Sequence, residues 1–132
     1  MTQSIAQAAA MRDAFDRIEE SYEFMLAYAA QGRKREVEEG GGESQIRQYL
    51  KRFLSALEAL DGAMAQGLGG PEAGPFTERF RGDLAVVRSV LAILLAQPSI
   101  NSDMIDNTNG LIALRAFLTD VFFVDQAVLP AR

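Results

Sequence analysis

The sequence predicts an all-α protein, folded as an antiparallel up-down-up-down four-helix bundle, on the strength of two observations. Large apolar residues recur at alternating steps of three and four in four successive segments, and no segment shows the strict alternation of a half-buried strand. Glycine and proline separate these segments, and the connections are short enough to return consecutive helices antiparallel. The 132 residues, 48% of them hydrophobic, are sufficient for one globular domain.

The first two helices are predicted over about residues 4–31 and 44–66. Ser4 and Gln7 fit a capping box at the start of the first helix, and Gly32 follows its end. The apolar stripe of the first helix consists of Ala8, Met11, Phe15, Ile18, Tyr22, Met25 and Ala29. The stripe of the second consists of Ile46, Leu50, Phe53, Leu57, Leu60 and Met64. Each stripe gives its helix one face that belongs in a shared core.

The third helix is predicted over about 75–97 and the fourth over about 102–129. Pro75 suits the first position of a helix, and Pro98 and Pro130 follow the two predicted ends. The stripe of the third helix consists of Phe76, Phe80, Leu84, Val87, Leu91 and Leu94. The stripe of the fourth consists of Leu111, Leu114, Leu118 and Val121. All four helices therefore carry the same heptad rhythm, which is typical of a bundle.

The fourth segment opens with "DMIDNTNG", whose Asp, Asn, Thr and Gly residues favour caps and turns over helix interiors. One interpretation is an extended N-terminal cap, with the regular helix starting near Asn107 or Asn109. The alternative is a binding site for a small polar ligand, formed by these amides and by tyrosines of the first helix. The predicted ligand-binding residues are Tyr22, Tyr28, Asp106, Asn107 and Asn109.

Composition excludes several classes of function. The chain has no cysteine and no histidine, so disulfides, thiolate sites and imidazole-based catalysis are ruled out, and no cofactor is predicted. The formal charge of −5 argues against nucleic-acid binding, which needs a basic face. The apolar run "VLAILLA" is far too short to span a membrane, and the N-terminus does not resemble a signal peptide. We therefore expect a soluble cytoplasmic protein.

Two acidic stretches suggest an enzyme. "EESYE" supplies Glu19, Glu20 and Glu23, and "EALD" supplies Glu58 and Asp61. The pair resembles the E-E-x-x-E and E-x-x-D motifs of the all-α nucleotide pyrophosphohydrolases. The resemblance implies a magnesium-dependent enzyme in which these five residues hold the metal against the phosphates of a nucleotide.

The heptad phase favours a different role for these acids. If Ile18, Tyr22 and Met25 face the core, Glu20 lies opposite the core and its acidic neighbours lie on the flanks. Metal-binding acids of a bundle converge on its interior instead. The phase therefore predicts solvated acids and a non-catalytic protein.

The last segment contains the strongest sign of an interaction. In "LIALRAFLTDVFFV" only an arginine, a threonine and an aspartate are polar, and a helix that is apolar nearly all round must be covered on most faces. A single bundle covers about half of each helix, so the rest predicts a self-association surface. We expect a homodimer, and an accessory, adaptor, chaperone-like or regulatory role that depends on helix–helix contacts. The predicted interface residues are Ile112, Phe117, Phe122, Phe123 and Val124.

The charged stretch "RKREVEE" between the first two helices has two interpretations. Its three cations are suited to the C-terminus of a helix, where positive charge is favourable. It can also be a docking loop that influences partner choice electrostatically.

Overall fold

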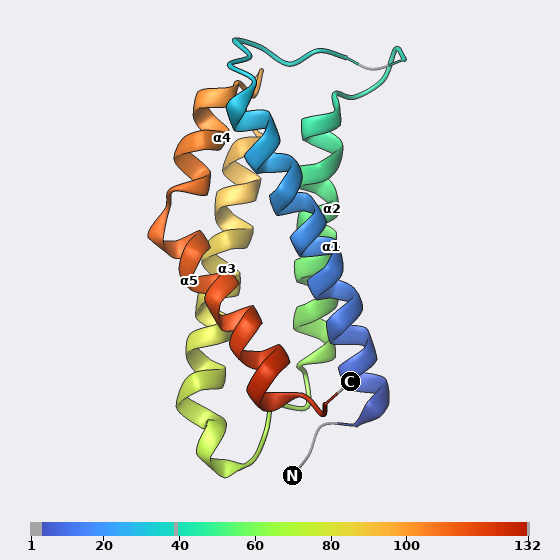
Figure 1. The fold of residues 1–132 in the computed structure, drawn as a ribbon, viewed down its shortest axis with the longest axis vertical. Helices are drawn as coiled ribbons and strands as arrows, with labels where there is room; N and C mark the ends of the chain where they lie inside the picture. Colours follow the sequence, from blue (N-terminus) through green and yellow to red (C-terminus); the bar gives the residue numbers. More distant parts are fainter. Residues whose placement is uncertain (1–3, 39, 132) are drawn as a thin grey trace.

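Serine side chains cap the first two helices in the computed structural model, which describes residues 4–38 and 40–131. Helix α1 (Ile5–Ala30) begins after Ser4, whose Oγ accepts a hydrogen bond from the Gln7 N–H over 3.0 Å. Helix α2 (Gln45–Ala63) begins after Ser44, which caps it in the same way. Each cap satisfies an N–H that the first helical turn cannot bond internally. The two helices run side by side in opposite directions (Figure 1).

Helix α3 (Gly74–Leu95) follows a single 3₁₀ turn, η1 (Pro71–Ala73), and carries a proline in its first turn, as predicted. It packs between α2 and the last long helix, α5 (Ile112–Phe123). The described residues form five α-helices and no strand, so the predicted all-α class is confirmed for this part of the chain. None of these helices is both long enough and apolar enough to cross a membrane.

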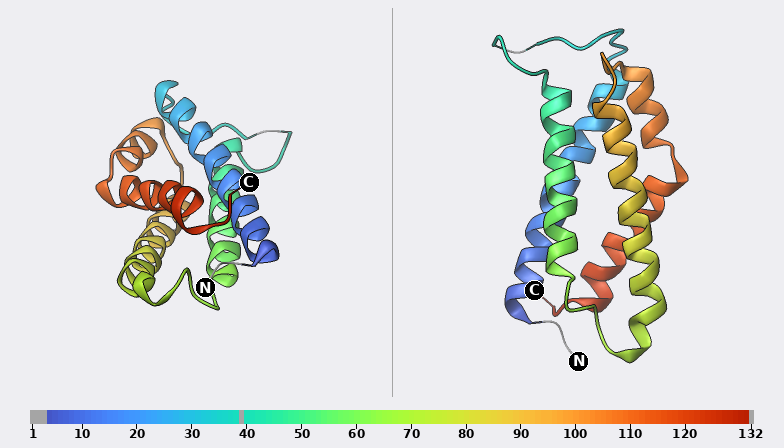
Figure 2. Two further views of the ribbon diagram at one scale, coloured as in Figure 1. Left: turned by 60° about the horizontal axis from the view of Figure 1, so that its bottom comes forward. Right: turned by 180° about the vertical axis from the view of Figure 1, so that it is seen from behind.

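The prediction of one continuous helix over 102–129 is wrong. The segment forms α4 (Ser102–Asn109), α5 and a short π-helical turn, η2 (Val124–Val128). The break lies at Leu111, whose extended backbone (φ −64°, ψ 131°) separates the two helices. As a result α4 packs on α1 while α5 packs on α3 (Figures 1 and 2).

The stretch "DMIDNTNG" is not the extended cap that its composition suggests. Most of it lies inside α4, and the cap is Asn101, whose Oδ1 accepts a hydrogen bond from the Met104 N–H over 2.9 Å. Thr108 remains compatible with the helix because its hydroxyl donates to the Met104 carbonyl one turn earlier. The interpretation that the regular helix starts near Asn107 or Asn109 is therefore wrong, because α4 already starts at Ser102.

Burial confirms the heptad phase of the first three predicted helices. Every stripe residue of the second helix is buried, and so is every one of the third except Phe76, which is half-buried. Of the stripe residues in α1, only Tyr22 and Ala29 are half-buried. In the last predicted helix the phase is wrong at Leu111, which is 40% exposed, whereas Leu114 and Val121 are buried. Phe53, Phe80 and Phe117 are the largest fully buried side chains and lie on three different helices.

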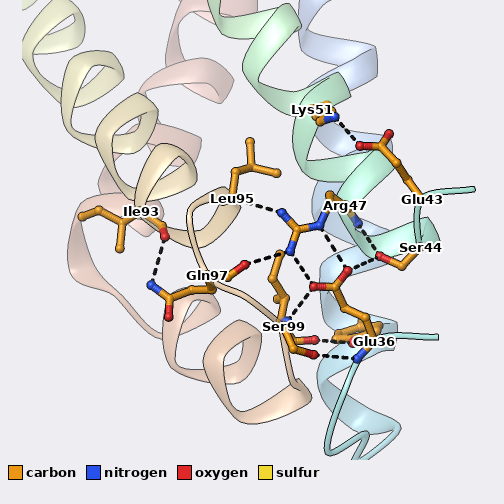
Figure 3. Close-up of polar contacts among 11 residues, drawn as sticks. Glu36, Glu43, Ser44, Arg47, Lys51, Ile93, Leu95, Gln97 and Ser99 are labelled. Atoms are coloured by element: carbon orange, nitrogen blue, oxygen red, sulfur yellow. Dashed lines mark hydrogen bonds and ion pairs between the residues drawn. The ribbon is translucent and has the colours of Figure 1, made fainter. Parts of the chain in front are cut away.

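The ion pair between Glu36 and Arg47 joins the α1–α2 connection to the α3–α4 connection (Figure 3). Glu36 accepts hydrogen bonds from Arg47 Nη2 over 2.7 Å, from Ser44 Oγ over 2.7 Å and from the Ile100 N–H over 2.7 Å. Arg47 also donates to the carbonyls of Leu95 and Gln97. The stretch "RKREVEE" is thus bound into the fold through its first acid.

The cations of "RKREVEE" lie outside this network. Arg33, Lys34 and Arg35 are exposed and follow the end of α1 in a non-helical connection. The last residue of the stretch, Glu39, lies outside the described residues. The docking role of this loop stays a prediction.

Candidate binding cleft

A cleft opens between α1 and α5 because the two helices diverge. Before the break at Leu111, α4 packs on α1, whereas after the break α5 packs on α3. The space left between α1 and α5 has a volume of about 290 Å³. Its walls are mainly apolar, with Phe15, Ile18, Tyr22 and Leu26 from α1 and Leu118, Val121 and Phe122 from α5.

Polar ties between α1 and the C-terminal segment bound the cleft. At one end Arg12 Nε lies 2.7 Å from Asp125 Oδ1, and Arg12 Nη2 donates to the Pro130 carbonyl over 2.7 Å. Towards the other end Asn109 Nδ2 donates to the Met25 carbonyl over 3.2 Å. The cleft is therefore an opening between two fixed points of the fold.

The rim of the cleft is acidic. Asp16, Glu19 and Glu23 follow one another along α1 at steps of three and four, and all three are exposed. Asp125 lines the α5 side and is bonded to Arg12. No lysine or arginine is among the described residues that line the cleft. An apolar floor beside a row of carboxylates suits an amphipathic ligand with positive charge.

Comparison with protein families, curated proteins and solved structures finds no match for this chain. Function must therefore be inferred from the geometry of the molecule.

The structure divides the five predicted interface residues between core and surface. Phe117 and Val124 are both 0% exposed, so their prediction as surface residues is wrong. Phe117 stacks on Phe80 of α3, with ring centroids 5.8 Å apart, because α5 is covered by its own chain on that side. The other three are exposed: Ile112 by 83%, Phe122 by 64% and Phe123 by 51%.

Only one of these exposed residues lines the cleft. Phe122 lies in its wall, whereas Phe123 turns towards Phe76 of α3, with ring centroids 5.0 Å apart. Ile112 lies at the first position of α5. The exposed aromatic surface of α5 is therefore smaller than predicted and consists of Phe122 and Phe123.

Four of the five predicted ligand-binding residues surround a second, polar hollow of about 600 Å³. Tyr22, Asp106, Asn107 and Asn109 line it together with Arg115, and it shares Tyr22 and Leu26 with the cleft. Asn109 is almost wholly buried, and its Oδ1 has no hydrogen-bond partner among the described residues.

The fifth predicted ligand-binding residue, Tyr28, is absent from this hollow. It is buried, and its hydroxyl donates to the Ile100 carbonyl over 2.6 Å. Burial, followed by the negative charge of Glu36, raises the pKa of Tyr28. Tyr28 therefore stabilises the junction of α1 with α4.

The five predicted metal ligands do not come together. Glu19, Glu20, Glu23 and Glu58 are exposed, as the heptad phase predicts. Asp61 is half-buried and lies 3.6 Å from Arg81 and 3.9 Å from Arg88. Across residues 4–38 and 40–131, no three acidic side chains are grouped so that they can hold a metal ion.

A pair of carboxyl groups between α3 and α5 was not predicted from the sequence. Burial raises the pKa of Asp120 to about 7, and a hydrogen bond with Asp83 and repulsion from its charge contribute further. Arg79 opposes this shift, and its Nε lies 3.0 Å from Asp83 Oδ1. Neither sequence spacing nor periodicity indicates this pair, because it depends on how α5 packs on α3.

Proposed function

We propose that this protein is a non-catalytic binding protein whose cleft between α1 and α5 receives a helix of a partner protein. The observation that carries the proposal is an apolar opening left uncovered between two helices that are otherwise well packed. Helices commonly bind such grooves through residues at i, i+3 or i+4, and i+7. From Phe15 to Leu26 the α1 wall is about 17 Å long at ~1.5 Å per residue, which matches about three turns of a bound helix.

The cleft also accounts for the arrangement of the helices. In this proposal α4 and α5 together form the fourth element of an antiparallel four-helix bundle, and the break between them keeps that element from closing on α1 along its whole length. The contacts of α4 with α1 and of α5 with α3 support this view. The bound helix takes the place beside α1 that α5 leaves open.

Phe122 provides the test. A displayed library of helical peptides of about 15 residues is selected on the wild-type protein, and the binders are measured by fluorescence anisotropy. We expect Phe122→Asp to weaken binding at least about tenfold, because burying a phenylalanine is worth ~1.5 to 3 kcal/mol. Ile112→Asp is the matched control, since Ile112 is exposed on the same helix but does not line the cleft.

Two results would contradict this proposal. One is a library that yields no binder, and the other is equal binding by the wild type and Phe122→Asp. Thermal melts of both variants distinguish a lost contact from a lost fold, because an exposed side chain can be changed with little effect on stability.

A homodimer is the second candidate, and the neighbouring exposed rings of Phe122 and Phe123 favour it. In this case the apolar surface around the cleft is covered by a second copy of the chain. The oligomeric state in solution tests this candidate.

A further inference from the structure

We infer that the helix bound in the cleft is cationic: an amphipathic segment with lysine or arginine along the edge that faces α1. This inference rests on the proposed function and specifies the chemistry of the partner. It is carried by the charge of the rim, where carboxylates form a row and cations are missing from the described lining.

The spacing of the carboxylates fits a helical partner. Asp16, Glu19 and Glu23 repeat at the steps that place residues on one side of α1. Along a helix these steps correspond to rises of about 4.5 and 6 Å. A partner helix that lies along α1 repeats its own side chains at the same intervals, so a lysine or arginine on each turn can face one carboxylate.

The three arginines of α1 and α5 all lie outside the cleft lining. Arg12 is held by Asp125 and by the Pro130 carbonyl at one end. Arg115 lines the adjoining polar hollow and not the cleft. Arg17 pairs with Asp13, which is also outside the cleft lining. The partner must therefore supply the positive charge.

A second copy of this chain is a poor match for the same cleft. Two copies that meet face to face would bring their acidic rims together, and like charges across an interface oppose binding. The one dense run of cations in the described chain, Arg33 to Arg35, is non-helical and cannot lie in the cleft as a helix. The negative charge of the rim therefore favours a different protein over a second copy of this chain as the partner.

The test uses a displayed library with fixed apolar anchors and randomised flanking positions, selected on the wild type and counter-selected on Phe122→Asp. We expect lysine and arginine to exceed aspartate and glutamate at flanking positions. One selected peptide is then synthesised, and its Kd is measured on charge-reversed variants. We expect Glu19→Lys to weaken binding by about fivefold, and Glu20→Lys by less than about twofold. Glu20 is the matched control, since it is exposed beside Glu19 but does not line the cleft.

The possible outcomes separate this inference from the proposed function. Binders that need Phe122 but show no excess of basic flanking residues overturn the inference and leave the cleft as a helix-binding site. Equal weakening by Glu20→Lys also overturns it, because the effect then comes from the overall charge of the protein. If no binder depends on Phe122, both the inference and the proposed function fail.

Discussion

At the scale of single residues, Glu36 joins the connection after α1 to the connection before α4. Burial alone would raise the pKa of Glu36, but hydrogen bonds from Arg47, Ser44 and the backbone of Ile100 outweigh burial and lower it. The charged form is therefore the one that the fold stabilises. The side chains of Glu36 and Arg47 are only 13% and 19% exposed, so solvent screens their attraction weakly.

This network predicts a large effect for Arg47→Met. The change leaves Glu36 without its main cation and removes the hydrogen bonds to Leu95 and Gln97. We expect the free energy of unfolding, measured by urea denaturation, to fall by about 2 to 4 kcal/mol. Lys51→Met is the control, because the pair that Lys51 forms with Glu43 is exposed and should contribute less than about 1 kcal/mol. Similar losses in both variants would contradict the structural role of Arg47.

The sequence could not predict the role of Glu36. Its partners lie 11 and 64 residues further along the chain, and a charge run in a connection gives no sign of such distant contacts. The local pattern predicted only that the preceding cations lie at the C-terminus of a helix. They follow the end of α1, and its last turn contains no basic residue.

At the scale of elements, the heptad rhythm predicted the buried faces of α1, α2 and α3, because burial follows from the spacing of apolar residues along one helix. The break between α4 and α5 could not be predicted in this way. Gly110 has φ −86°, a conformation open to any residue, and the extended residue is Leu111. Competing contacts of α4 with α1 and of α5 with α3 accompany the break, and these are long-range. The cleft was missed for the same reason.

The contact between α3 and α5 predicts an unusual dependence of stability on pH. The pKa of Asp120 is about 7 in the folded protein against a usual value of 3.8, so the folded state binds this proton more tightly than the unfolded chain. The protonated Asp120 therefore contributes to the free energy of unfolding. This contribution is fully present below pH 3.8 and is lost as the pH rises through about 7.

Asp120→Asn tests this dependence, because an amide resembles the protonated acid and does not titrate. We expect the variant to be more stable than the wild type at about pH 8, by about 1 to 3 kcal/mol, and the difference to shrink towards about pH 5. Urea denaturation at both pH values gives the comparison. Asp103→Asn, a change at an exposed aspartate of α4, is the control. A difference that stays constant between the two pH values would contradict the raised pKa of Asp120.

At the scale of the whole molecule, the sequence predicted the all-α fold class better than the candidate site. It placed Tyr22 with three residues of α4, which do line one hollow, because a short helix beside α1 presents them together. It took α5 as apolar nearly all round and expected a second copy to cover it. The chain itself covers Phe117, and of the α5 residues that stay exposed only Phe122 lies beside the acidic rim. The periodicity of one helix shows which of its faces are apolar. It does not show which neighbouring element covers each face, because that depends on the whole fold.

The acidic rim also predicts that self-association through the cleft is weak at low ionic strength. With a net charge of −5 and the carboxylates beside Phe122, two copies that meet through the cleft repel each other at low ionic strength. The Debye length falls from about 10 Å at about 0.1 M salt to about 3 Å at about 1 M, so salt weakens this repulsion. We therefore expect sedimentation equilibrium to give a monomer at about 0.1 M salt and stronger association at about 1 M. A stable dimer at low salt that Phe122→Asp dissociates would show that a second copy covers the cleft, and that its acidic rim does not prevent this.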